Sequence, residues 1–235
     1  MNKIIRRIPV IFIFVAAAVV FAGCAGPKTI TKVEKYPLMY EEKPLTILIL
    51  PPMNESTAAE AKAYYATTIQ EVLSYWGYYV FPYEVTSDIL KMEGIYDAEL
   101  IHSVPLEKFR EYFGADAVLF TTIKRWDLRY VVLAASLTVS IDEELKSTKT
   151  NQTLWAHSGT VVVDLSGGNT GGGLAGLIAK AIVTAANSAM ADYVPYARQA
   201  NYRALYTFPF GKYHPSYMKD QTMQFVDVTP VKNKN

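Results

Sequence analysis

The stretch Leu45-Thr46-Ile47-Leu48-Ile49-Leu50-Pro51-Pro52 decides the fold of this chain. Its apolar run is unbroken, which is typical of a strand buried on both faces of a sheet, and the two prolines end that strand. A helix is predicted next, over 57–76, because Thr57 and Glu60 have the spacing of a capping box. A second strand over 78–81 completes a strand–helix–strand unit, which favours parallel pairing of the two strands.

The remaining sequence predicts short helices, a long hairpin and C-terminal helices. Alternating polar and apolar residues over 130–141 and 153–165 indicate an antiparallel hairpin around the polar stretch 142–152. The acidic run Asp142-Glu143-Glu144 is thereby placed at the hairpin tip, where charges keep an exposed end soluble. The fold class is therefore α/β (α+β), a mixed sheet with flanking helices. Its other elements are predicted at 84–92, 98–102, 105–113 and 116–123, and after the hairpin at 174–190 and 194–206.

The N-terminus has the layout of a bacterial secretory signal. A basic start precedes the apolar run 8–21, and the small pair Ala22-Gly23 precedes Cys24, the only cysteine of the chain. The apolar run is too short for a stable membrane span. Cys24 occupies the position of a lipobox cysteine, so we expect it to be acylated with fatty acids such as palmitate and to become the new N-terminus. The alternative is a plain signal peptide with an incidental cysteine.

These features divide the chain into a signal peptide (1–23), a lipidated N-terminus with its tether (24–44), a single α/β domain (45–206) and an extended C-terminal tail (207–235). The signal holds three of the 23 basic residues, which leaves 20 basic against 22 acidic residues in the mature chain. This balance argues against nucleic acid as a partner, because nucleic acid requires a clustered basic surface. The 17 tyrosines suit partly hydrated interfaces, which favours self-association.

Two loops are candidate ligand or interface sites. Gly171, Gly172 and Gly173 begin a formal G-x-G-x-x-G pattern, which in dinucleotide sites lies between a strand and a helix. Here the preceding strand belongs to a hairpin and no parallel strand follows, so we expect a connecting loop and no cofactor. Asn54 and Ser56 lie at the carboxyl end of the first strand, where open α/β sheets bind ligands, or they order the turn into the helix.

The sequence supplies no recognisable catalytic or metal-binding set. The histidines His102, His157 and His214 lack metal-ligand spacing, and no G-x-S-x-G motif is present. Lipid on Cys24 removes the only thiol nucleophile. A hydrolase that uses Asp142 or Glu143 is left open by spacing alone. The small-residue stripe of 174–190 packs on the sheet or forms a helix contact between subunits.

Several segments, in this order, resemble a family of bacterial lipoproteins of uncharacterised function. The resemblance covers about 45–204 and implies the fold of the TolB N-terminal domain, with relatives in CsgG, the curli secretion lipoprotein, and PelC, an exopolysaccharide export lipoprotein. Genes of this family often neighbour CsgG-like ones, and the family supplies no catalytic residues. The segments are 48–56, 77–82, 102–106, 113–117, 153–155 and the Gly-Gly-Gly-Leu loop at 171–174.

The expected function is that of a non-enzymatic lipoprotein on the outer membrane that faces the periplasm and assists secretion or export. Ala25, and not Asp, follows the cysteine, which favours the outer over the inner membrane under Gram-negative sorting. The expected partners are the membrane through the N-terminal lipid, further copies of the chain, and CsgG-like or other envelope lipoproteins. The alternative is a periplasmic solute-binding or sensor lipoprotein with a pocket near Asn54 and the glycine loop.

Overall fold

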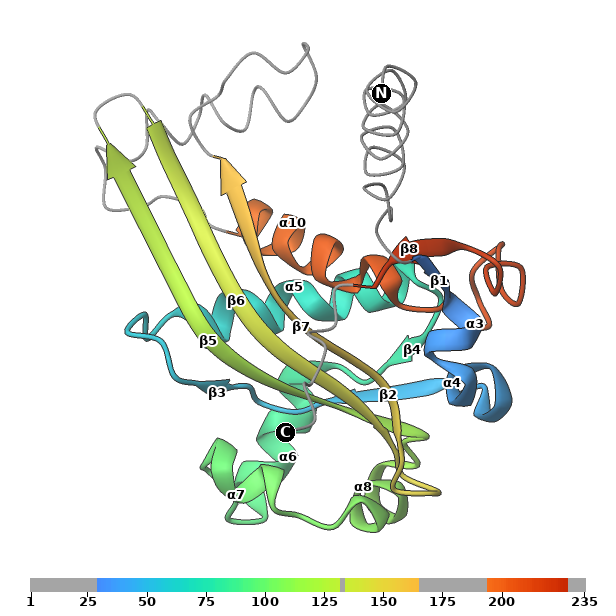
Figure 1. Ribbon diagram of the computed structural model, residues 1–235. Helices are drawn as coiled ribbons and strands as arrows, with labels where there is room; N and C mark the ends of the chain where they lie inside the picture. Colours follow the sequence, from blue (N-terminus) through green and yellow to red (C-terminus); the bar gives the residue numbers. More distant parts are fainter. Residues whose placement is uncertain (1–28, 132–133, 165–193, 228–235) are drawn as a thin grey trace, which may run out of the picture.

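The computed structural model describes residues 29–131, 134–164 and 194–227 (Figure 1). Within these ranges a six-stranded mixed sheet has the order β4-β2-β5-β6-β7, with β3 also paired to β5. β2 is parallel to both β4 and β5, whereas β6 is antiparallel to its two neighbours, β5 and β7. The strands are β2 (Thr46–Ile49), β3 (Met53–Asn54), β4 (Tyr79–Val80), β5 (Ala117–Val131), β6 (Ala134–Ser147) and β7 (Thr153–Asp164). The predicted mixed sheet and its parallel unit are confirmed.

Helices cover the two faces of the sheet, as expected from the apolar run in β2. Ile47 and Ile49 point into a core with α5 (Ala61–Tyr75) and α10 (Val194–Ala204), which lie side by side in Figure 1. Leu48 and Leu50 point to the other face and pack with α6, α7 and α8. Those three helices and the 3-10 turn after α10 are α6 (Tyr83–Met92), α7 (Ala98–His102), α8 (Leu106–Phe113) and η1 (Leu205–Thr207).

The start of α5 differs from the predicted capping box. The helix begins at Ala61, and Glu60 occupies the N-cap position without a side-chain hydrogen bond. Its C-terminal turn is as expected, because Gly77 has a φ of 88°. A Cβ atom at Gly77 would also lie 2.3 Å from the backbone nitrogen of His214, so this glycine permits close packing against the C-terminal segment.

The hairpin tip was predicted at the wrong place. β6 continues to Ser147, so Asp142-Glu143-Glu144 lies in the middle of a central strand, where Asp142 pairs with Thr122 and Ser158. The connection to β7 spans 148–152 instead, and Asn151 there has the left-handed φ of 59° that asparagine tolerates in turns. Side chains alternate between the two faces of β6, so Glu143 lies on the same buried face as Ile141 and Leu145. Glu143 is therefore only 2% exposed.

The expected tether and tail are folded wherever the structure describes them. β1 (Thr29–Thr31) pairs antiparallel with β8 (Gln224–Val226), so the two ends of the described chain form one ribbon. α3 (Lys32–Lys35) begins with a capping box formed by Thr31 and Glu34, and α4 (Pro37–Glu42) follows. Tyr36, Met39 and Tyr40 are buried in the core of the sheet. An irregular tether was wrong for 29–44 because these aromatic and apolar side chains have a core to enter.

Some sequence predictions lie outside the described residues. They are the signal peptide, Cys24, the loop Gly171-Gly172-Gly173 and the helix predicted at 174–190. In the part of the chain that the structure describes, no helix is long and apolar enough to cross a membrane.

Candidate functional site

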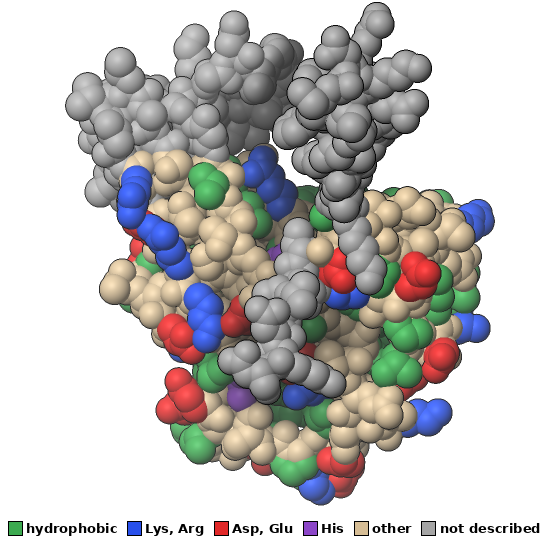
Figure 2. Space-filling view, viewed as in Figure 1, with side chains coloured by type: hydrophobic (Ala, Val, Ile, Leu, Met, Phe, Trp, Pro, Cys, Tyr) green, Lys and Arg blue, Asp and Glu red, His purple; other side chains and the backbone are tan. Residues whose placement is uncertain are grey.

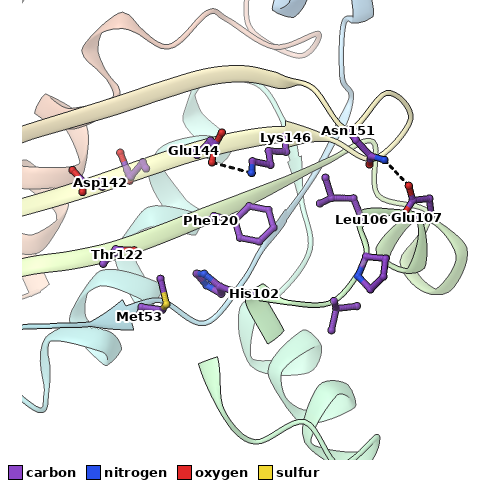
Figure 3. Close-up of a pocket in the computed structure, with 13 residues that line it drawn as sticks. Met53, His102, Leu106, Glu107, Phe120, Thr122, Asp142, Glu144, Lys146 and Asn151 are labelled. Atoms are coloured by element: carbon purple, nitrogen blue, oxygen red, sulfur yellow. Dashed lines mark hydrogen bonds and ion pairs between the residues drawn. The ribbon is translucent and has the colours of Figure 1, made fainter. Parts of the chain in front are cut away.

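A cavity of about 610 Å³ lies between the sheet and the segment that joins α7 to α8 (Figure 3). The alternation of side chains along β5 and β6 builds one wall, since Phe120 pairs with Glu144 and Thr122 with Asp142 on the same face. His102, at the end of α7, lies opposite that wall. The side chains labelled in Figure 3 are Met53, His102, Leu106, Glu107, Phe120, Thr122, Asp142, Glu144, Lys146 and Asn151.

His102 is held in a fixed orientation by two contacts. Its Nε2 lies 3.1 Å from the carbonyl oxygen of Pro51, which can only accept, so Nε2 carries the proton. Its ring meets Phe120 edge to face, with centroids 5.1 Å apart. Burial lowers the pKa of His102, so the neutral ring is favoured at neutral pH. His102 lacks metal-ligand spacing and the sequence around it gives no sign of a site, so only the fold shows that this residue lines a cavity.

The carboxylates of Glu144 and Glu107 in this cavity already have hydrogen-bond or ion-pair partners. Glu144 lies 3.1 Å from the Nζ of Lys146 and accepts from the hydroxyl of Thr153 at 2.5 Å. Glu107 accepts from the Nδ2 of Asn151 at 2.5 Å, and this hydrogen bond lowers the pKa of the Glu107 carboxyl.

Asp142 is also partnered. It accepts from the hydroxyl of Ser158 at 2.7 Å and lies 3.8 Å from the Nζ of Lys124. The lysine ammonium at Lys146 also lies 5.5 Å from the centre of the Phe120 ring. The cavity therefore combines fixed charges with an aromatic surface, which suits the binding of a polar molecule.

A second polar group lies on the other face of β6, around Glu143. The hydroxyl of Tyr65 on α5 donates to the Oε1 of Glu143 at 2.5 Å, so the hydroxyl of Thr121, 2.7 Å away, donates to the Tyr65 oxygen. Burial raises the pKa of Glu143 to about 7. Burial also holds the pKa of Tyr65 well above its usual range. Strict alternation from Ile141 to Leu145 was the signal in the sequence that places Glu143 on the apolar face.

The loop residues singled out in the sequence order a turn. The Oδ1 of Asn54 accepts from the backbone nitrogen of Ser56 at 3.1 Å and from its hydroxyl at 2.6 Å. The Nδ2 of Asn54 donates to the carbonyl of Ala58 at 2.7 Å. Their neighbour Met53 lines the cavity. The polar groups of Asn54 and Ser56 instead form hydrogen bonds within the turn. The third part of that expected site, the glycine loop, lies outside the described residues.

The other histidines have structural partners. His214 stacks on Phe210 with ring centroids 3.8 Å apart, and its Nδ1 accepts from the backbone nitrogen of Ser216 at 3.0 Å. His157 stacks on Trp155, with centroids 6.0 Å apart. Over the ranges that the structure describes, no three His, Cys, Asp or Glu side chains are grouped so that they could hold a metal ion.

A family model and a sequence relative agree on one family. The model of the family described as "Putative lipoprotein GNA1162-like" matches residues 35–209. The "Putative lipoprotein NMB1124/NMB1162" of Neisseria meningitidis serogroup B is 33% identical over 157 residues, which are 67% of this chain and 72% of that protein. The crystal structure of lipoprotein GNA1162 from the same species is 34% identical, with a TM-score of 0.49 over 62% of this chain and 100% of that chain. A PelC dodecamer from Paraburkholderia phytofirmans is 11% identical, with a TM-score of 0.43 over 80% of this chain and 96% of that chain.

Proposed function

Since this chain belongs to the GNA1162-like family of lipoproteins, we propose that it is a lipid-anchored accessory component of an export or secretion system at the outer membrane. It faces the periplasm and acts through its surface, without catalysis. Its partners are further copies of the chain and CsgG-like or other envelope lipoproteins, and its domain is of the TolB N-terminal type.

The short sequence distance between Cys24, the proposed site of the lipid, and the folded body is the observation that carries this proposal. β1 begins at Thr29, only five residues after Cys24. A fully extended chain spans at most about 3.6 Å per residue, so the body starts within about 18 Å of the acylated cysteine. A lipoprotein that acts far from its membrane needs a long linker. This one is built to act close to the bilayer, beside other envelope components.

The first described residues are also held tightly to the rest of the domain, so a lipid at Cys24 would fix where the domain lies relative to the membrane. The β1–β8 ribbon and the capping box of α3 hold the first described residues. Next in the chain, Lys32 is buried against Asp220. The anchored end is thus continuous with the core, and the orientation of the body follows from that of its first strand.

Exposed tyrosines supply surface for protein partners. Tyrosine contributes a large contact area together with a hydrogen-bonding hydroxyl, and interfaces are enriched in it. On the face seen in Figure 2, basic and acidic side chains of the described residues are interspersed, which suits protein partners better than nucleic acid. The most exposed tyrosines are Tyr75, Tyr79, Tyr96, Tyr112, Tyr206 and Tyr213.

Cross-linking in intact cells followed by purification of the native lipoprotein tests the role in export. Photo-reactive side chains at Tyr96 and Tyr112 should capture an export or secretion lipoprotein, or a second copy of the chain. The same group at Thr67, which is exposed on α5, is the control for chance capture. Recovery of neither kind of partner from the tyrosine positions contradicts the proposal.

A second candidate function, binding of a periplasmic solute, is favoured by the cavity beside His102. Its volume of about 610 Å³ falls within the range of small-molecule sites, about 300–1,000 Å³. A screen of nucleotides, sugars and envelope fragments should then give a saturable rise in the melting temperature of the full chain. The rise should disappear in Phe120→Ala, which removes the aromatic wall. No saturable rise with any compound argues against this function.

A further inference from the structure

A second cavity, of about 560 Å³, lies between β7 and the C-terminal segment that contains η1 and β8. Aromatic rings of Tyr36, Trp155 and Phe225 line it, and Glu143 and His157 also reach it. Tyr36 stacks on Phe225 with centroids 6.2 Å apart and lies 6.3 Å from Trp155. The aromatic surface is thus continuous from β8 to β7.

Three polar side chains cross the apolar face of the sheet in one row. The register pairs Thr121 of β5 with Glu143 of β6, and Glu143 with His157 of β7. Directly opposed residues on antiparallel strands have Cβ atoms about 5 Å apart. Glu143 and His157 are therefore neighbours on the same face, within reach of one small group placed between them.

Each of these two neighbours has a buried polar atom without a hydrogen-bond partner. They are the Oε2 of Glu143 and the Nε2 of His157, and Glu143 as a whole is 2% exposed. Leaving a buried acceptor without a donor costs free energy, and native proteins rarely do so. Here the two residues that carry such atoms are paired directly across β6 and β7, and both residues line the same cavity.

No cationic side chain of the described residues pairs with Glu143, although the other acids of the cavity have such partners. The acids at its rim are ion-paired: Asp142 with Lys124 at 3.8 Å, Glu144 with Lys146 at 3.1 Å, and Asp227 with Lys35 at 2.9 Å. Among the described residues, Glu143 forms no ion pair, and Tyr65 satisfies only its Oε1.

The imidazole of His157 is placed to accept a hydrogen bond. Burial lowers the pKa of His157, so the ring is neutral at neutral pH and one of its nitrogens is an acceptor. Gly159 makes room for the ring, since a Cβ atom there would lie 2.7 Å from the Nε2 of His157.

We propose that this cavity binds a small molecule through a primary ammonium group, which donates to the Oε2 of Glu143 and the Nε2 of His157. An ammonium has three donors and a positive charge, so it satisfies both acceptors and neutralises the carboxylate. The body of the ligand lies against Trp155 and Tyr36, whose ring faces also attract a cation. This site does not depend on the lipid anchor or on any export partner, so either proposal can fail without the other.

Titration calorimetry of the full mature lipoprotein in detergent tests the site with benzylamine as the probe. Benzyl alcohol, which has the same ring and a neutral hydroxyl, is the matched control ligand. Benzylamine should bind saturably, and benzyl alcohol should bind at least about tenfold more weakly because it leaves the carboxylate without a cation. Equal binding of the two compounds, or no saturable heat with benzylamine, overturns the proposal.

Variants locate the binding within the chain. Glu143→Gln keeps an acceptor for the Tyr65 hydroxyl and should weaken benzylamine binding at least about tenfold. Asp88→Asn, which removes an exposed carboxylate on α6, should leave it unchanged. Unchanged affinity in folded Glu143→Gln overturns the assignment. If that variant does not fold, the comparison of amine and alcohol in the natural protein decides the question.

Discussion

The Nζ of Lys32 lies 3.2 Å from the Oδ2 of Asp220, and the two side chains are only 3% and 0% exposed. Lys32 also donates to the carbonyl of Phe208 at 2.9 Å, and its Nζ lies 4.6 Å from the centre of the Phe210 ring. Asp220 accepts in addition from the backbone nitrogen of Phe210 at 3.0 Å. This buried pair joins residues 188 positions apart and fixes the first helix of the described chain to the C-terminal segment.

Removing one member of this pair should destabilise the fold strongly. Asp220→Ala leaves the Lys32 ammonium buried without its carboxylate, which should lower the free energy of unfolding by about 3–5 kcal/mol. The double variant Lys32→Met, Asp220→Leu should recover most of that loss, because it removes both charges. Urea denaturation of the mature chain measures the effect. Asp88→Ala breaks the exposed pair with Lys91 and should cost less than about 0.5 kcal/mol. Equal losses in Asp220→Ala and Asp88→Ala would show that the buried pair is unimportant.

Glu143 should make stability depend on pH. Its folded pKa, about 7, lies above the ordinary value of 4.5, so the folded state holds this proton more tightly than the unfolded state. Its contribution to stability is complete below about pH 4.5 and is lost as the pH rises through 7. Glu143→Gln cannot ionise, so its stability relative to the natural protein should rise by roughly 2–3 kcal/mol between pH 4.5 and pH 8. Urea titrations at the two pH values measure this, and a difference that does not change with pH contradicts the assignment.

Two glycines in turns should respond differently to alanine. Gly77 has a φ of 88° and Gly94 a φ of 82°. Because alanine is strained at such angles, each alanine variant should lose about 1 kcal/mol of its free energy of unfolding. Only at Gly77 would the new Cβ atom meet backbone, 2.3 Å from the nitrogen of His214, whereas Gly94 is surrounded by open space. Gly77→Ala should therefore lower the melting temperature clearly more than Gly94→Ala. Equal shifts would show that the C-terminal segment yields freely at this point.

Arg203 should protect the outer strand of the sheet from pairing with other chains. Its Nη1 donates to the carbonyl of Val162 on β7 at 2.7 Å, and β7 is an edge strand of the described sheet. An exposed edge is a template for aggregation. Arg203→Ala should raise light scattering on mild heating. Arg198→Ala removes another arginine of α10, which is paired with Glu71 of α5, and should not raise it. Similar scattering of the two variants contradicts a specific role at the edge.

The sequence predicts the centre of the fold well because the signals there are local. The run 45–50 alternates between two buried faces and ends at Pro51, and the helix that follows ends just before Gly77. The hairpin tip was misplaced because polarity at Asp142 and Glu144 was taken to mark a turn. These two residues instead occupy a half-open face of β6, and the real turn has its signal at Asn151.

Other features depend on contacts that a local pattern cannot show. Thr29 pairs with Val226 across most of the chain, so neither segment alone reveals a strand. The cavity beside His102 exists only because α7 is folded against β5, and the row of Thr121, Glu143 and His157 depends on the register of three strands. Of the two interpretations of the loop at Asn54 and Ser56, a ligand site or an ordered turn, the structure favours the turn, because the two side chains hydrogen-bond to each other there.

Membrane attachment through Cys24 is tested most directly by the mass of the N-terminal peptide of the native protein, measured separately in membrane and soluble fractions. The expected result is a peptide that begins at Cys24, carries fatty acyl chains and occurs in the membrane fraction alone, while Cys24→Ala moves the chain to the soluble fraction and Gly26→Ala does not. An unmodified N-terminus on soluble protein from the natural sequence would contradict the lipid anchor and the function proposed from it.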